Sequence, residues 1–355
     1  MTAVQALAMP AAGAAFETIT IQRRALRDDD VRIEIAYAGI CHSDIHTVRE
    51  EWGPITFPLV PGHEIAGVVA EVGPAVTRVR VGDRVGVGCM VDSCGTCDAC
   101  KDGQENYCRN GAVWTYGSDD VDGTTTQGGY SQQVVVAERF VARVPDGIGL
   151  DVAAPLLCAG ITTYNPLKRF GAGPGTTVAV VGLGGLGHMG VKIAVAMGAE
   201  VTVMSRTRAK EADARELGAS GYVATGEEGA LEAVASTYDI VLNTVSADLP
   251  VQAYLETTRP RGALVNVGLP PSDFVVSPWS VVGGSRIVAG SNIGGMALTQ
   301  EMLDFCAQHD IAATIETISA DDVDAAYDRV VAGDVHYRAV IDVTSIGAAA
   351  TTSAH

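Results

Sequence analysis

Residues 178–187 read VAVVGLGGLG, and this stretch decides the fold of the second half of the chain. An apolar run suited to a buried strand leads directly into the pattern Gly182-x-Gly184-x-x-Gly187, and a helical stretch follows to Met197. The first glycine permits a tight turn, the second lets the backbone approach a pyrophosphate, and the third lets the helix pack on the strand. Because the pattern lies between a strand and a helix, it predicts a dinucleotide-binding site rather than a mere structural turn.

The sequence around this motif alternates between strand-like and helical segments. Helices are expected at 151–170 and 209–217, and strands at 201–204, 240–243, 263–267 and 286–289. Strands that alternate with helices favour a parallel, doubly wound sheet.

The first part of the chain follows a different pattern. Short β-like runs at 31–35, 67–72 and 84–87 are separated by Gly and Pro residues, which predicts an antiparallel β domain with long loops. A helix at 299–309 and a strand at 339–343 are expected to close the fold.

The composition limits the classes of partner. The formal charge is −18 without a basic run, so we expect neither nucleic acid nor an anionic membrane as a partner. The sequence has no apolar run of about 18 residues that would span a bilayer. Residues 1–16 lack the basic start of a secretory signal, so the expected location is the cytoplasm.

The tip of the second strand indicates which dinucleotide is bound. A site for NAD places an acidic residue there to hold the ribose hydroxyl. Here residues 205–208 read Ser-Arg-Thr-Arg, and Lys210 follows. These hydroxyls and cations suit a 2′-phosphate, so NADP is favoured over NAD; the alternative is a solvated basic loop.

Four of the eight cysteines lie close together in one loop with the spacing C-x2-C-x2-C-x7-C. This spacing fits a tetrahedral zinc ion with four thiolate ligands and no open position, which is a structural site. Free thiols or disulfides are the alternative. The four residues are Cys94, Cys97, Cys100 and Cys108.

A second set of potential ligands is dispersed along the chain, at Cys41, His63 and Cys158. Three such ligands with an open fourth position are the pattern of a catalytic zinc ion. Taken singly, each residue also reads as a buried cysteine or a packed histidine, and spacing alone does not select them.

Together these features resemble the zinc-containing medium-chain alcohol dehydrogenase/reductase superfamily, most closely its NADP-dependent branch of cinnamyl-alcohol-dehydrogenase-like enzymes. The resemblance runs from Arg24 to Val343. It includes the motif Gly62-His63-Glu64-x-x-Gly67, the cysteine loop, the glycine-rich turn and the segment 334–338.

The resemblance implies roles for particular residues. Cys41, His63 and Cys158 would hold a catalytic zinc ion, with Glu64 as a carboxylate that ligates it in some states. Ser43 would contact the substrate oxygen and His46 would pass a proton to solvent, with Glu51 as an acid nearby or simply a solvated residue. The implied cofactor-binding residues are Thr162, Gly182, Gly184, Gly185, Leu186, Gly187, Ser205, Arg206, Thr207, Lys210 and Arg338. For Thr162, a helix hydroxyl bonded to its own backbone is an equal alternative. Trp52, Trp114 and Ile293 are expected to line an apolar substrate pocket.

The expected architecture is therefore an α/β protein with a GroES-like, β-rich catalytic domain and a Rossmann cofactor domain. The expected ranges are 1–154 for the domain with the zinc sites, 155–292 for the cofactor domain and 293–355 for a return to the first domain. The expected activity is hydride transfer between NADP(H) and primary alcohols or aldehydes, aromatic aldehydes included, with two zinc ions per chain and a homodimeric assembly. An NAD-dependent polyol or secondary-alcohol dehydrogenase, or a non-enzymatic dinucleotide-binding sensor, are the alternatives.

Overall fold

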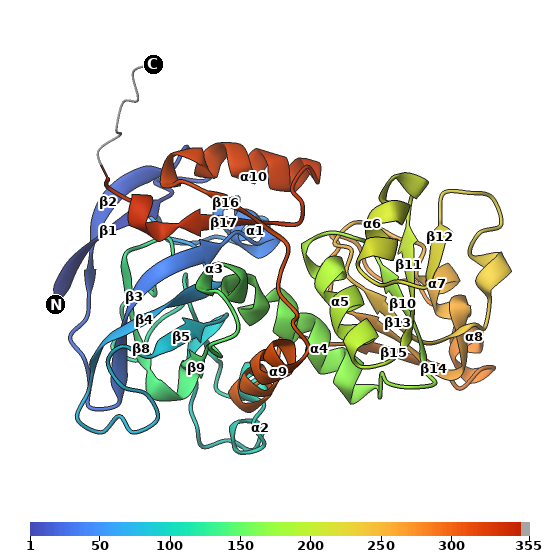
Figure 1. Ribbon diagram of the computed structural model, residues 1–355, viewed down its shortest axis with the longest axis horizontal. Coiled ribbons are helices and arrows are strands. Elements are labelled where there is room, and N and C mark those ends of the chain that lie inside the picture. The colour runs from blue at the N-terminus through green and yellow to red at the C-terminus, as the bar shows by residue number, and fades with distance from the viewer. Residues whose placement is uncertain (349–355) are drawn as a thin grey trace. The chain divides into compact units, whose positions relative to one another are not determined.

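The computed structural model describes residues 1–348, which fold into two compact units. The first unit combines Met1–Cys158 with the chain from Gly295 onward, and the second unit is Ala159–Gly294. Figure 1 shows this return of the chain, because the red C-terminal helix lies beside blue N-terminal strands. The unit boundaries lie a few residues beyond the expected limits of 154 and 292.

The second unit is built on a six-stranded sheet in which every neighbouring pair is parallel. Its strand order is β12-β11-β10-β13-β14-β15, so the chain starts in the middle and winds out to both edges. This confirms the predicted doubly wound sheet. The strands are β10 (Thr177–Val181), β11 (Glu200–Ser205), β12 (Gly221–Ala224), β13 (Tyr238–Asn243), β14 (Thr258–Asn266) and β15 (Ile287–Gly290). The helices are α4 (Ala159–Arg169), α5 (Gly185–Ala196), α6 (Glu211–Glu216), α7 (Val251–Thr257) and α8 (Pro278–Val282).

The first unit contains a seven-stranded sheet in the order β16-β17-β3-β4-β5-β9, with β8 also paired to β3. Alternate residues of β3 point into the core, so Val31, Ile33 and Ile35 are buried while Glu34 is exposed. The sheet strands are β3 (Asp30–Gly39), β4 (Ile65–Val72), β5 (Arg84–Val87), β8 (Gln133–Ala137), β9 (Ala142–Arg143), β16 (Ile315–Ile318) and β17 (Arg338–Asp342). Two small ribbons pair β1 (Thr2–Ala8) with β2 (Glu17–Arg23) and β6 (Met90–Asp92) with β7 (Val113–Trp114). The helices are α1 (His42–Val48), α2 (Asp98–Lys101), α3 (Leu150–Ala153), α9 (Met296–Gln308) and α10 (Val323–Ala332).

The single helix predicted over 151–170 is wrong. The structure has α3, a short 3-10 turn over Ala154–Leu157, and then α4. Pro155 lacks an amide hydrogen for a helical bond, and Cys158 has φ −123° and ψ −69°, outside the helical region. The break therefore places Cys158 at a bend at the end of this segment of the first unit rather than within a helix.

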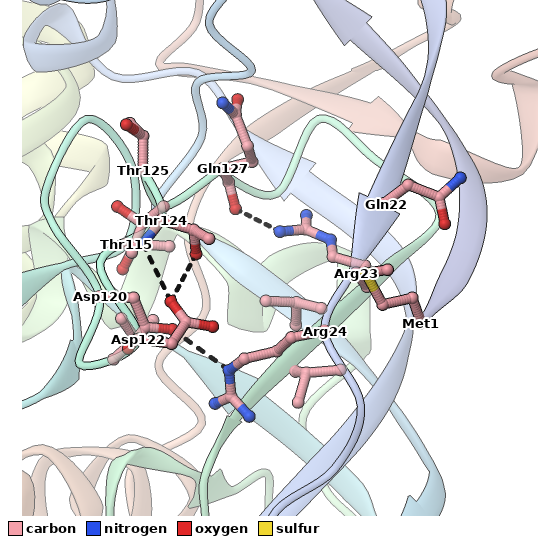
Figure 2. A pocket seen from close by; sticks show the side chains of 14 residues that line it. Met1, Gln22, Arg23, Arg24, Thr115, Asp120, Asp122, Thr124, Thr125 and Gln127 are labelled. Carbon is pink, nitrogen blue, oxygen red and sulfur yellow. Dashed lines mark hydrogen bonds and ion pairs between the residues drawn. The ribbon is translucent and has the colours of Figure 1, made fainter.

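A polar cavity in the first unit lies between the end of β2 and residues 119–127 (Figure 2). The Arg23 guanidinium donates to the carbonyls of Gln127 and Gly128, and Arg24 pairs with Asp30 and Asp120. Since these guanidinium groups already bond to the protein, we assign the cavity a structural role.

Within residues 1–348, every helix is too short or too polar to cross a membrane.

Candidate active site

Three of the four predicted ligands of the catalytic metal come from separate turns of the first unit. Cys41 is the N-cap residue of α1, His63 precedes β4, and Cys158 lies at the bend before α4. The Sγ atoms of the two cysteines are 3.9 Å apart, and His63 Nε2 lies 3.3 Å from Cys158 Sγ. Two thiolates that share a tetrahedral zinc ion are separated by about 3.8 Å, since each Zn–S bond is about 2.3 Å long. The spacing therefore suits zinc.

The fourth residue of this cluster is Glu64, and its side chain is fully buried. Its ligand atom lies within 4.8 Å of those of the other three residues. Neither carboxylate oxygen has a hydrogen-bond partner within the described part of the chain, although Arg338 Nη1 lies 3.1 Å from Oε1 as an ion pair. Arg338 balances the charge of this carboxylate, but buried oxygens without hydrogen bonds remain costly, so they are suited to ligate a metal ion.

Shared protons and burial determine the protonation of the cluster. The hydrogen bond from Cys158 lowers the pKa of the Cys41 thiol well below its ordinary value, and the same bond raises the pKa of Cys158. Burial raises the pKa of Glu64 to about 8, against the lowering effect of Arg338. A metal ion binds deprotonated thiols, so its binding would release protons from this cluster.

The hydroxyl and imidazole predicted to act beside the metal both lie on α1. Ser43 Oγ is 3.7 Å from Cys41 Sγ, which places the hydroxyl at the metal cluster. His46 Nδ1 forms a short contact with the Glu51 carboxylate, and its ring stacks on Trp52 with centroids 5.0 Å apart. Its Nε2 is buried without a hydrogen-bond partner among residues 1–348. His46 therefore has one ring nitrogen, Nδ1, that is paired with Glu51, and one buried ring nitrogen, Nε2, that forms no hydrogen bond within the described residues.

Asp44 is a functional residue that the sequence analysis missed. Its buried carboxylate accepts hydrogen bonds from the amides of Cys41 (2.9 Å) and Gly62 (3.2 Å) and from the Tyr130 hydroxyl (3.3 Å). It also lies 3.0 Å from His63 Nδ1. A carboxylate at Nδ1 fixes the tautomer of a metal-binding histidine and leaves Nε2 for the metal. Asp44 therefore orients His63 and anchors the loop of Cys41.

The cysteine loop brings its four thiols together as the spacing predicts, with all four sulfurs within 4.8 Å of one another. Cys97 and Cys100 are 3.5 Å apart, and the amides of Thr96 and Cys97 donate to Cys94 Sγ. These amides lower the pKa of the Cys94 thiol to about 5. Thiolates that accept backbone hydrogen bonds are suited to binding a metal ion. The set offers four sulfur ligands and no open position.

The glycine-rich turn of the second unit has the geometry predicted for dinucleotide binding. Gly182 has φ +89°, and a Cβ atom on Gly187 would lie 2.1 Å from the Gly182 carbonyl oxygen, so both positions need glycine. A Cβ on Gly184 would meet no atom within 4 Å, which leaves open space at the start of α5. Gly185 and Leu186 form the first turn of that helix, whose amides can meet a pyrophosphate.

The cationic residues of the basic tip after β11 differ in whether they are paired with carboxylates. Arg208 pairs with Glu227 and Glu211 and is thereby neutralised. Arg206 forms no ion pair within the described residues, and Lys210 Nζ donates to the Leu183 carbonyl (2.9 Å) of the glycine-rich turn. The tip thus offers Arg206 and Lys210 as cations for a phosphate, and the hydroxyl residues Ser205 and Thr207 belong to the same segment.

Comparison with known proteins agrees with this geometry. The family models for an alcohol dehydrogenase GroES-like domain and for a zinc-binding dehydrogenase match residues 27–146 and 185–308. The chain is 54% identical over 347 residues to NADP-dependent alcohol dehydrogenase C 1 of Mycolicibacterium smegmatis, covering 98% of this chain and 99% of that one. The chain belongs to the zinc-binding alcohol dehydrogenase family.

Two solved structures extend the comparison within this family. A cinnamyl alcohol dehydrogenase of Sorghum bicolor has a TM-score of 0.93 and 42% identity, covering 97% of this chain and 98% of that one. A cinnamyl alcohol dehydrogenase of Helicobacter pylori, solved with NADP(H), has a TM-score of 0.91 and 41% identity, covering 97% and 99%. The predicted superfamily and its cinnamyl-alcohol-dehydrogenase-like branch are confirmed.

The remaining predicted residues of this dehydrogenase lie in varied surroundings. Arg338 is buried against Glu64 and donates to the Ile40 carbonyl, so its predicted contact with the cofactor stays a prediction. Thr162 is buried in α4. Trp114 lies partly exposed on β7, and Ile293 is buried in the second unit with its carbonyl bound by an amide side chain. Their place in a substrate pocket also stays a prediction.

Cys89 is a further cysteine beside the proposed catalytic metal site. It is partly exposed and hydrogen bonds to both Cys158 and His63, so it lies against the metal cluster. The bond with Cys158 lowers the pKa of the Cys89 thiol to about 6. No motif marks Cys89 in the sequence, because only the fold of β6 and its neighbours brings it there.

Proposed function

We propose that this protein interconverts aldehydes and primary alcohols with NADP(H), aromatic aldehydes included, at a zinc ion held by Cys41, His63 and Cys158. The observation that supports this most is the buried cluster of two thiols, an imidazole and a carboxylate with unbonded oxygens. Three strong ligands with a fourth position available to Glu64 or a substrate are the arrangement of catalytic zinc sites.

The bound groups would supply the chemistry that side chains cannot. Zinc acts as a Lewis acid toward a carbonyl oxygen, and NADPH supplies the hydride. The residues of the chain orient the substrate and move the proton. Ser43, whose Oγ lies 3.7 Å from Cys41 Sγ, would bond the substrate oxygen, and His46, whose Nδ1 contacts the Glu51 carboxylate, would carry the proton outward.

The basic tip after β11 supports the preference for NADPH. A 2′-phosphate would gain charge-assisted hydrogen bonds from Arg206 and Lys210, together with the hydroxyls of Ser205 and Thr207. An acidic residue that would bind the ribose hydroxyl of NAD is missing at this tip. The relatives named for NADP are consistent with this choice.

Initial rates with benzaldehyde test the proposal. We expect wild-type protein to oxidise NADPH faster than NADH and to lose this activity when a chelator removes its zinc. Cys158→Ala should abolish turnover while NADPH binding persists, whereas the control Cys306→Ala, in the core of α9, should remain active. Turnover that persists after verified loss of zinc would refute the zinc site.

The cofactor preference has its own variant. Arg206→Asp removes the unpaired cation and places an acid where NAD-dependent relatives of this fold use one, so the ratio of kcat/KM for NADPH over NADH should fall by at least tenfold, about 1.4 kcal/mol. An unchanged ratio would show that the tip is only a solvated loop. A wild-type preference for NADH would favour the NAD-dependent polyol or secondary-alcohol dehydrogenase instead.

We also propose that the protein forms a homodimer through the second unit. β15 is the edge strand of the sheet, and Val288 on it is 40% exposed. On the neighbouring α8, Trp279 is 77% exposed and Val282 is 71% exposed. An apolar edge strand is prone to pair with another chain, and a second copy would cover it by two-fold symmetry. Light scattering of wild type and Trp279→Glu measures the assembly, and a monomeric wild type would overturn this proposal.

The cytoplasmic location of the protein remains a prediction.

A further inference from the structure

We propose that Tyr130 and Tyr327 are positioning residues that hold His63 in the geometry for binding zinc. This inference rests on the proposed function, since it concerns the same metal site. It extends that site from the ligand His63 through Asp44 to two buried tyrosines, the second of which lies on the C-terminal helix α10.

Tyr130 contacts the ligand loop in three ways. Its amide donates to the Pro61 carbonyl (3.0 Å), and its hydroxyl donates to Asp44 Oδ2 (3.3 Å). Its ring lies against Gly62, where a Cβ atom would come within 2.5 Å of the ring. Gly62 has φ +103° and directly precedes His63. Tyr130 therefore fixes the backbone before the ligand, and it also fixes the carboxylate that orients the ligand ring.

Tyr327 is linked to Asp44 by hydrogen bonds that run through Tyr130. Its hydroxyl donates to the Tyr130 hydroxyl at 3.3 Å, and both side chains are buried. The two hydroxyls thus form a chain of donors that ends on the Asp44 carboxylate. Such chains polarise one another in a low-dielectric interior, so the outer donor strengthens the inner bond. Tyr116 is a further hydrogen-bond partner of Asp44, and its ring centroid lies 5.8 Å from that of His63.

Packing around the tyrosines provides a matched control. The Phe16 ring lies edge-on to Tyr327 with centroids 5.1 Å apart and is 6.1 Å from Tyr130. Phe16→Leu therefore loosens the packing of both tyrosines but leaves their hydroxyl chain intact. Tyr130→Phe and Tyr327→Phe do the opposite, because they delete one hydroxyl and keep the ring.

The experiment measures how fast zinc leaves each variant in a chelator, at a temperature where circular dichroism shows all of them folded. Removing a partner of a metal-binding histidine weakens metal affinity about 10–100-fold. We expect Tyr130→Phe to lose one of its two zinc ions about tenfold faster than wild type, and Tyr327→Phe to lose it a few-fold faster. The double variant should match Tyr130→Phe, since Tyr327 acts through it. Phe16→Leu should match wild type.

A second readout reports the geometry of the site. After cobalt replaces zinc, the visible absorption bands of the tyrosine variants should shift, while those of Phe16→Leu should not. Tyrosine variants that match Phe16→Leu in both readouts, or additive effects in the double variant, would overturn the inference alone. If the wild-type chain holds a single zinc ion and Cys97→Ser loses it, the catalytic cluster binds no zinc. That result would overturn the proposed function as well.

Discussion

At the scale of single residues, Gly39 shows how closely the backbone approaches the proposed metal site. A Cβ atom at Gly39 would lie 2.0 Å from Glu64 Oε2. We predict that Gly39→Ala displaces Glu64 from the cluster, because the carboxylate is fully buried and has no space to retreat. Overpacking of this kind costs about 1–3 kcal/mol of stability. The loss of kcat/KM, expressed as a free energy, should exceed the loss in the free energy of unfolding. Kinetic assays measure the first loss and melting curves measure the second.

Gly147 provides the control for this substitution. A Cβ atom there would meet nothing within 4 Å, and its φ is not positive. Gly147→Ala should therefore leave both stability and activity near those of wild type. If Gly39→Ala keeps wild-type kcat/KM, Glu64 has no fixed role at the cluster.

At the scale of elements, the cysteine loop depends on its metal for its structure. α2 has four residues, none of them buried, so the loop has little core of its own. The loop also supports α9, since Glu105 Oε2 accepts a hydrogen bond from the Met296 amide at 3.0 Å. We predict that Cys97→Ser releases the structural zinc and destabilises the unit by ~3 kcal/mol, which lowers Tm by about 6–12 °C.

Metal analysis and melting curves of the same samples test this prediction. Cys97→Ser should hold one zinc ion per chain, and some activity should remain at low temperature because the other site is intact. Cys306→Ala, which removes a buried cysteine outside both clusters, should keep two. A variant that keeps two zinc ions would show that three thiols suffice for this site.

Elements that depend on local pattern were predictable from the sequence. The strand expected over 84–87 is β5, and the cysteine loop forms its cluster because all four thiols come from one short segment. The single helix predicted over 151–170 was wrong because Pro155 lacks an amide hydrogen and the backbone of Cys158 leaves the helical region. Asp44 lies within α1 and reads as an ordinary helix acid, so only the packing of distant segments reveals its role.

The dispersed ligands needed more than spacing. Cys41 and Cys158 are separated by 117 positions, yet their sulfurs lie 3.9 Å apart. The resemblance to a family selected them, and the folded chain then brought them together. Cys89 had no such signal, although it lies against the same cluster.

At the scale of the whole molecule, the formal charge of −18 makes stability depend on pH through many carboxylates. The contribution of Asp30 to this pH dependence can be distinguished from that of the other carboxylates. Asp30 is fully buried and forms ion pairs with Arg24 and Arg27. Burial acts to raise its pKa, but the Arg24 hydrogen bond, the Arg27 amide and both positive charges outweigh burial. The pKa of Asp30 is thereby held below its ordinary value of 3.8.

The sign of the pH effect follows from this depressed pKa. The unfolded chain binds the Asp30 proton more readily than the folded chain, so the stabilisation is complete above about pH 5 and is lost as pH falls through 3.8 toward the folded-state pKa. We predict that Asp30→Asn costs roughly 2–4 kcal/mol at pH 7 and progressively less below pH 4. Melting curves of both proteins from pH 7 to pH 3 give this difference, in which the other carboxylates cancel. Asp29→Asn, at an exposed neighbour, should show little difference at any pH. A difference for Asp30→Asn that stays constant down to pH 3 would mean that Asp30 stabilises the first unit by its shape and hydrogen bonds rather than by its charge.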